Sequence, residues 1–151
     1  MDQTHSDGAR PKPRRRVAER LPESKILRET LLALSRAGAL VQRNNSGLLI
    51  GADGRRVRVG VKGAADILAC MPVGWGVRVG VFIAVECKSA TGRLSKAQKN
   101  YRTAALKAGA LHFIVKSEDD IAAMIHELER ARRWLHGGND MPDCLAALIQ
   151  P

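Results

Sequence analysis

The chain has 151 residues, a length typical of a single domain. Hydrophobic residues make up 45% of it and aromatic residues only 3%, so the core must consist of Leu, Ile, Val and Ala. The formal net charge is +10. A surplus of this size favours a nucleic-acid partner, because Lys and Arg displace the counterions condensed on phosphates. The alternative is a basic surface without a special role.

Several classes of protein are disfavoured by the sequence. No apolar run approaches the ~20 residues of a membrane span, and the basic N-terminus lacks the apolar segment of a signal peptide. The three cysteines, Cys70, Cys87 and Cys144, form no CxxC motif and no cluster with histidine. Neither a disulfide framework nor a zinc site is indicated, and we expect a protein of the reducing cytoplasm.

The first elements follow a polar segment. Residues 1–20 read as a disordered basic arm, which either binds nucleic acid or is a solvated tail. With six basic and three acidic residues it carries +3 of the charge, and the remaining +7 lies beyond it. Apolar residues at helical spacing predict a helix over residues 22–37. The polar stretches 44–47 and 51–54 predict turns, with short strands around them that include residues 57–59.

The middle of the chain predicts a hairpin. Residues 65–71 are mostly apolar and read as a strand, residues 73–76 as a turn, and residues 77–87 as a longer strand with strict alternation. Such a hairpin places Asp66 near Glu86.

The last part of the chain contains two helices and a strand. Ser95 opens a helix that ends before Gly109, residues 111–115 form a strand, and a third helix runs from Ser117 to about Leu135. Both helix starts predict capping boxes, completed by Gln98 and Asp120 respectively. The order of elements predicts a mixed central sheet flanked by helices, in an α/β domain over residues 21–136 with a tail at 137–151.

Two acidic residues have environments that point to chemistry. Glu86 and Lys88 end an apolar strand and share one face, because strand residues two apart point the same way. Such a pair is more often an exposed ion pair. Asp66 lies in an apolar stretch, where an unpaired charge is costly. The alternative is that Asp66 only caps a loop. If Asp66 and Glu86 lie side by side, their negative charges repel each other, and a bound Mg²⁺ ion would offset this repulsion. The backbone carbonyl of Cys87 is a further candidate ligand.

Two helix-start residues complete the pattern. Glu23 lies in the first turn of the first helix, where it either faces this site or only favours the helix dipole. Gln98 can act both in its cap and beside the site. Together with Asp66, Glu86 and Lys88, these residues appear in an order that suits a metal-dependent nuclease.

In that order the chain resembles VRR-NUC domains, a branch of the PD-(D/E)XK nuclease superfamily. The resemblance covers roughly residues 22–117. It rests on Glu23, residues 63–66, residues 86–88 and Gln98, and it extends to the flanking runs 42–47, 60–63 and 92–95.

The resemblance implies a restriction-endonuclease-like core with the order αβββαβ and a C-terminal helix. It makes Glu23, Asp66 and Glu86 the metal ligands, Lys88 the catalytic lysine and Gln98 an accessory residue. Stand-alone phage and bacterial members are similar compact chains that tend to be homodimers.

We therefore expect a DNA endonuclease dependent on Mg²⁺ or Mn²⁺. Because a symmetric dimer presents two sites, it would be structure-selective and resolve branched junctions. A non-selective or restriction-like nuclease, an RNA nuclease and a non-catalytic DNA-binding protein are the alternatives. Candidate contacts to the DNA backbone are the basic residues Lys62, Arg93, Lys96, Lys99 and Arg102.

Overall fold

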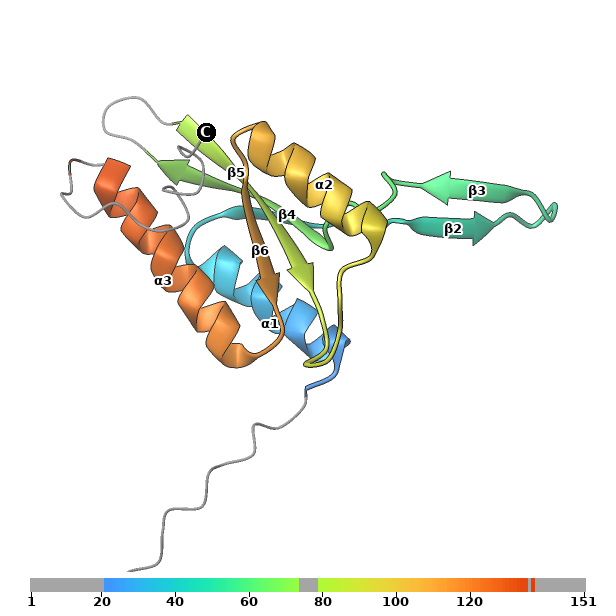
Figure 1. Ribbon diagram of the computed structural model, residues 1–151, viewed down its shortest axis with the longest axis horizontal. Coiled ribbons are helices and arrows are strands. Elements are labelled where there is room, and N and C mark those ends of the chain that lie inside the picture. Colours follow the sequence, from blue (N-terminus) through green and yellow to red (C-terminus); the bar gives the residue numbers. More distant parts are fainter. Residues whose placement is uncertain (1–20, 74–78, 136, 138–151) are drawn as a thin grey trace, which may run out of the picture.

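The structure, a computed structural model, describes residues 21–73, 79–135 and 137 (Figure 1). The predicted arm, most of the tail and the predicted turn after Val73 lie outside these residues. In chain order the elements are α1 (Glu23–Arg36), β1 (Leu40–Arg43), β2 (Gly47–Ile50), β3 (Arg56–Val59), β4 (Ile67–Val73), β5 (Val79–Cys87), α2 (Lys96–Lys107), β6 (Leu111–Val115) and α3 (Glu118–Leu135). Among the described helices, none has both the length and the apolar character needed to cross a membrane.

The main sheet has four strands in the order β1-β4-β5-β6. The pair β5–β6 is parallel, and the other two pairs are antiparallel. When the separate β2–β3 pair is set aside, the chain runs helix, three strands, helix, strand, helix. The expected order had three strands between the first two helices, whereas the structure has five, because the β2–β3 hairpin adds two. The mixed α/β fold with a mixed sheet is confirmed.

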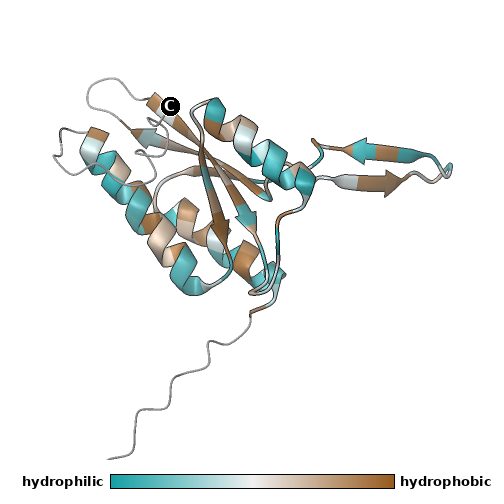
Figure 2. Cartoon of the chain, in the orientation of Figure 1, coloured by the Kyte–Doolittle hydropathy of each residue, from teal (hydrophilic) through white to brown (hydrophobic). Residues whose placement is uncertain are grey.

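The sheet has helices on both faces. The apolar core lies where α1 and α3 meet each other and one face of the sheet, and it includes Ile26, Leu34, Ile67, Ile83 and Leu128. Figure 2 shows the apolar strands enclosed by helices whose outer faces are hydrophilic. On β5, Ile83 and Cys87 face this core, so the alternation of the strand turns Glu86 to the other face, where α2 lies.

Predicted element bounds agree closely in the helices and differ in the hairpin. The strand at 111–115 is confirmed, and α1 and α2 begin and end within a residue of prediction. The strand predicted over 65–71 begins at Ile67 and continues to Val73, which the sequence placed in a turn. Ala65 instead follows a turn over residues 61–64, in which the Ala64 N–H donates to the Val61 carbonyl at 3.1 Å.

A second, two-stranded sheet projects from the body (Figure 1). It is the hairpin formed by β2 and β3, and its predicted turn at 51–54 is confirmed by a 2.9 Å hydrogen bond from the Gly54 N–H to the Gly51 carbonyl. The turn predicted at 44–47 is wrong. Residues 44–46 connect β1 to β2 without a turn, because Asn44 bonds to the distant chain at Ala65 and Asp66 rather than locally.

Candidate active site

The centre of the site is Glu86, near the end of β5. Its side chain is only 1% exposed. One carboxylate oxygen, Oε1, forms an ion pair with the Lys88 ammonium and also accepts a hydrogen bond from the Gln98 side-chain amide. The predicted shared face of Glu86 and Lys88 is therefore confirmed, but the pair is buried, unlike an ordinary surface ion pair.

The environment of Glu86 disfavours its charged form. Burial raises the pKa of this carboxyl, the Lys88 hydrogen bond opposes the rise, and the negative charge of Asp66 adds to it. The resulting pKa is about 7. Glu86 and Asp66 are thus close enough to feel each other's charge, as the predicted hairpin requires, and near neutral pH a proton partly offsets their repulsion.

Lys88 lies just beyond the end of β5. Its N–H donates to the Val115 carbonyl at 2.9 Å, which extends the pairing with β6 and fixes the backbone at this point. Burial lowers the pKa of the ammonium, but the bond to Glu86 and the surrounding carboxylates outweigh burial and raise it overall. One of these carboxylates is Glu23, whose Oε1 lies 3.8 Å from the Lys88 Nζ. Lys88 therefore stays positively charged.

Asp66 is held rigidly where the chain enters β4. Its Oδ2 accepts the Cys87 N–H at 2.9 Å. Asn44 holds the backbone from the other side, because its N–H donates to the Asp66 carbonyl at 2.8 Å and its side-chain amide donates to the Ala65 carbonyl at 2.9 Å. Asn44 is a positioning residue that the sequence did not single out, although it lies in the run 42–47 that the sequence analysis noted.

Gln98 combines the two roles predicted for it. The Ser95 N–H donates to its Oε1 at 2.9 Å, and the Gln98 N–H donates to the Ser95 hydroxyl at 3.2 Å, which completes the capping box of α2. The same side chain then presents its amide nitrogen to Glu86. Because its oxygen is committed to the cap, the amide can only donate toward the site.

Gly63 allows α2 to approach this site. Its φ is +80°, and a Cβ added here would lie 2.3 Å from the carbonyl carbon of Ala97, the residue before Gln98. The segment that approaches Gly63 so closely is the first turn of α2. The glycine thereby places Gln98 over the end of β5.

The Cys87 thiol belongs to the apolar core and not to the cluster around Glu86. It is buried, lies 3.9 Å from the Thr30 hydroxyl, and burial raises its pKa to about 12. A thiol with this pKa is protonated at neutral pH and is a poor nucleophile. Cys87 instead contributes its backbone, whose N–H binds Asp66.

The carboxylates of this site bear on the expected divalent cation. Within the described residues, no three carboxylate, imidazole or thiol groups are already close enough to hold a metal ion. Two adjacent carboxylates, Asp66 and Glu86, nevertheless suit a hard cation, since Mg²⁺ commonly uses one or two carboxylates with water. A cation would also offset the repulsion that raises the pKa of Glu86. Glu23, Asp66 and Cys87 line one hollow of about 530 Å³, and Glu86 is not among the residues that line it. Of the expected donors, the described geometry brings Asp66 and Glu86 together, and these two carboxylates fit such an ion.

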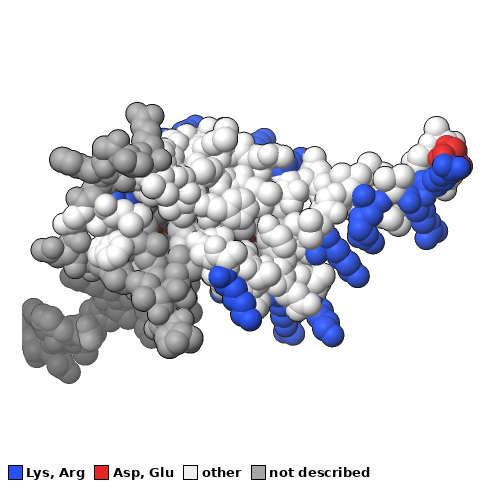
Figure 3. Space-filling view, turned by 90° about the horizontal axis from the view of Figure 1, so that it is seen from above, with Lys and Arg blue, Asp and Glu red and all other residues white. Residues whose placement is uncertain are grey.

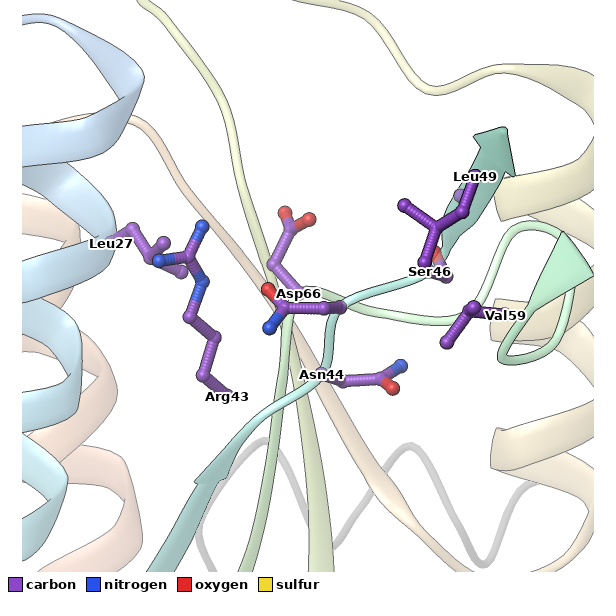
Figure 4. A pocket seen from close by; sticks show the side chains of 9 residues that line it. Leu27, Arg43, Asn44, Ser46, Leu49, Val59 and Asp66 are labelled. Carbon is purple, nitrogen blue, oxygen red and sulfur yellow. The ribbon is translucent and has the colours of Figure 1, made fainter. Parts of the chain in front are cut away.

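A neighbouring hollow extends from Asp66 to the hairpin. It has a volume of about 260 Å³, and Arg43 flanks Asp66 on one side while Leu49 and Val59 of the hairpin lie on the other (Figure 4). A phosphate entering beside Asp66 would therefore meet the Arg43 guanidinium, a cation that the sequence did not single out.

The predicted DNA contacts are all on the surface. Lys62 and Lys96 line one hollow together with Tyr101, so the segment before Asp66 and the start of α2 form a continuous basic surface. Arg102 lies one turn after Gln98, close enough to His112 to help lower its pKa. The exposed set is Lys62, Arg93, Lys96, Lys99 and Arg102.

No protein-family model, curated protein or solved structure matches this chain. The resemblance to VRR-NUC domains therefore stays a prediction from the sequence.

Proposed function

We propose that this chain is a metal-dependent DNA nuclease of the VRR-NUC type, with a restriction-endonuclease-like core. The observation that carries the proposal is the buried Glu86, which meets Lys88 and Gln98 beside Asp66. Burying such a cluster seldom improves stability over an apolar core. Strongly perturbed carboxylates of this kind are typical of functional sites.

In this proposal Asp66 and Glu86 hold the cation, with Glu23 and the Cys87 carbonyl at the edge of the same site. A bound Mg²⁺ or Mn²⁺ would lower the pKa of a coordinated water and offset charge on the phosphate. Lys88 is placed to orient the attacking water or to stabilise charge on the non-bridging phosphate oxygens. Gln98 holds Glu86 in one orientation, because its own amide is fixed by the cap.

Cation binding has a signature that is independent of cleavage. Since the pKa of Glu86 is about 7, a cation that needs its carboxylate must displace a proton near neutral pH. Calorimetric Mn²⁺ titrations at pH 6.5, in buffers of different ionisation enthalpy, should report proton release from the wild type and little from Glu86→Gln. Binding with equal proton release in both would exclude Glu86 as a ligand.

For the substrate we propose branched DNA cut by a homodimer. The net charge of +10 suits a polyanion, and a symmetric pair of sites suits paired cuts at a junction. Sequence reading is not needed for such a substrate, since contacts to phosphates position DNA without specifying bases.

The direct test is cleavage of end-labelled four-way junction, flap, linear duplex and single-stranded DNA in Mg²⁺, Mn²⁺ or EDTA. We expect metal-dependent cutting of the junction, lost in Asp66→Asn. Asp119→Asn is a matched control, because Asp119 is an exposed acid in the first turn of α3. Equal cutting of all substrates would contradict the proposed selectivity for branched DNA. No cutting in either metal would contradict the proposed nuclease activity.

A non-catalytic DNA-binding protein is the second candidate. It is favoured by the ion pair with Lys88, which already neutralises Glu86 without a metal. DNA binding and cutting by the wild type and Lys88→Ala distinguish the two candidate functions. A nuclease with this change should keep its DNA affinity and lose cutting, whereas a pure binding protein shows no cutting with or without it. Retained DNA affinity also shows that the variant is folded.

A further inference from the structure

We propose that the β2–β3 hairpin is an arm that binds duplex DNA through Arg56 and Arg58, alongside the candidate active site. The proposal deepens the proposed function and rests on it for the identity of the polyanion. It assigns a role to an element that neither the motif series nor the candidate active site uses.

The hairpin has little packing of its own to stabilise it, which indicates that it contacts a partner. A two-stranded sheet alone is marginal in water, and this one projects from the body with its apolar side chains in solvent. Ile50 is 71% exposed and Leu49 is 59% exposed. Pairing in register places Leu48 opposite Arg58 and Ile50 opposite Arg56 on one face. The other face is apolar.

The charge of the hairpin indicates which partner it takes. Arg55 is neutralised by Asp53 at 3.4 Å. No acidic side chain in the described ranges forms an ion pair with Arg56 or Arg58, which follow each other on one face of β3. Two residues of a strand span about 6.6 Å, so the two guanidinium groups can each contact a separate phosphate.

The arginine face continues into the basic surface of the body. Lys62 follows β3 after a turn and shares a hollow with Lys96 of α2. Figure 3 shows the resulting row of Lys and Arg, which runs from the tip of the hairpin along one side of the molecule to the body. The hairpin therefore extends an existing basic track instead of forming an isolated patch.

The base of the hairpin adjoins the candidate active site. Leu49 and Val59 line the hollow that contains Asp66 (Figure 4). DNA placed at Asp66 would therefore run close to the arm. A two-stranded ribbon is also narrow enough for the major groove of B-DNA. A second copy of the chain would be the other occupant, but the same face of that copy would bring two further arginines against Arg56 and Arg58, and these like charges repel.

The test measures binding in EDTA, where no cleavage occurs. Affinity for a short labelled duplex is measured by anisotropy over a salt series for the wild type and for Arg56→Gln/Arg58→Gln. The matched control is Arg132→Gln/Arg133→Gln, which removes the same charge from exposed positions in the last turn of α3. Arg56→Lys/Arg58→Lys keeps the charge and reports whether the hairpin tolerates substitution.

Losing two phosphate contacts should reduce the slope of log K against log salt by about 2. We expect this reduction in the glutamine hairpin variant only, with the lysine variant near the wild type. Equal slopes in the hairpin variant and the α3 control would overturn the proposal. So would an unchanged slope with a changed oligomeric state by sedimentation, which would assign the hairpin to a second copy. If the wild type binds DNA through the arm but cuts no DNA in Mn²⁺, the nuclease proposal fails and the proposal of a DNA-binding arm stands.

Discussion

At the residue scale, two buried titratable groups respond to pH in opposite directions. Glu86 has a pKa raised to about 7 by burial, so the folded state holds its proton longer than the unfolded state does. Its contribution to stability is therefore lost as pH rises from about 4.5 to about 7. His112, on β6, has a pKa lowered to about 4 by burial and by Arg102. Its contribution is lost as pH falls from about 6.5 to about 4.

These opposing effects predict a stability profile that changes little between pH 4.5 and 6.5 in the metal-free wild type. Glu86→Gln should expose the His112 effect, so the free energy of unfolding rises with pH, by up to about 3 kcal/mol over that interval. His112→Gln should show the reverse trend. Urea unfolding at several pH values measures both slopes. Parallel profiles in the two variants would contradict the assignment.

The sequence predicted which residues of the candidate site lie together better than it predicted the residues and elements that position them. Asp66, Glu86 and Lys88 were expected together because strand alternation and a hairpin are local rules. Asn44 was not singled out, since its bonds to Ala65 and Asp66 join segments about twenty residues apart. The burial of the Glu86–Lys88 pair was also not foreseen, because it depends on α2 covering the strand end.

At the scale of elements, the cap of α2 and the site share one side chain, and substitutions can separate their effects. Ser95→Ala removes the hydroxyl that accepts the Gln98 N–H and should cost about 1 kcal/mol of unfolding free energy. Cutting should change little, because the Gln98 oxygen still accepts the Ser95 N–H. Gln98→Leu should cost a similar amount and also lower single-turnover cutting, since Glu86 loses a donor. Equal cutting in both variants would show that Gln98 acts only as a cap.

The contact between residue 63 and α2 gives a second test at this scale. Gly63→Ala adds a methyl group where Ala97 leaves no space, at a φ of +80°. Gly109→Ala is the matched control, because Gly109 has the same φ and no atom within 4 Å of the added carbon. We expect a loss of about 1 kcal/mol in the control from backbone strain and about 3 kcal/mol at Gly63 from strain plus overpacking. Denaturant unfolding measures both, and equal losses would mean that α2 does not depend on this contact.

Element bounds show where sequence rules fail. The capping box of α2 was predicted because Ser95 and Gln98 bond within one turn. The box predicted at α3 formed only in part, since Asp120 accepts the Lys116 N–H rather than that of Ser117. The turn predicted at 44–47 failed for a related reason. Polar residues favour turns locally, but here the distant segment just before β4 supplies the hydrogen-bond partners of Asn44.

At the scale of the whole molecule, the fold consists of a packed body and a separable arm. Among the strands that the structure describes, β2 and β3 pair only with each other. The two ends of the arm meet where it leaves the body, because a Cβ added to Gly60 would lie 3.1 Å from the Cβ of Ser46. Removing residues 47–59 and joining Ser46 to Gly60 therefore closes a gap that the chain already spans.

This excision should leave the body folded, with an unfolding free energy within about 1 kcal/mol of the wild type, since the arm buries little of its apolar surface. The remaining loop is shorter, and its closure entropy changes only slightly. Urea unfolding measures this directly, and protection of the β4 and β5 amides from exchange reports the integrity of the site. A loss of several kcal/mol would show that the arm stabilises the body. If the body stays folded and duplex binding becomes weaker and less dependent on salt, the arm contributes to DNA binding and not to the stability of the body.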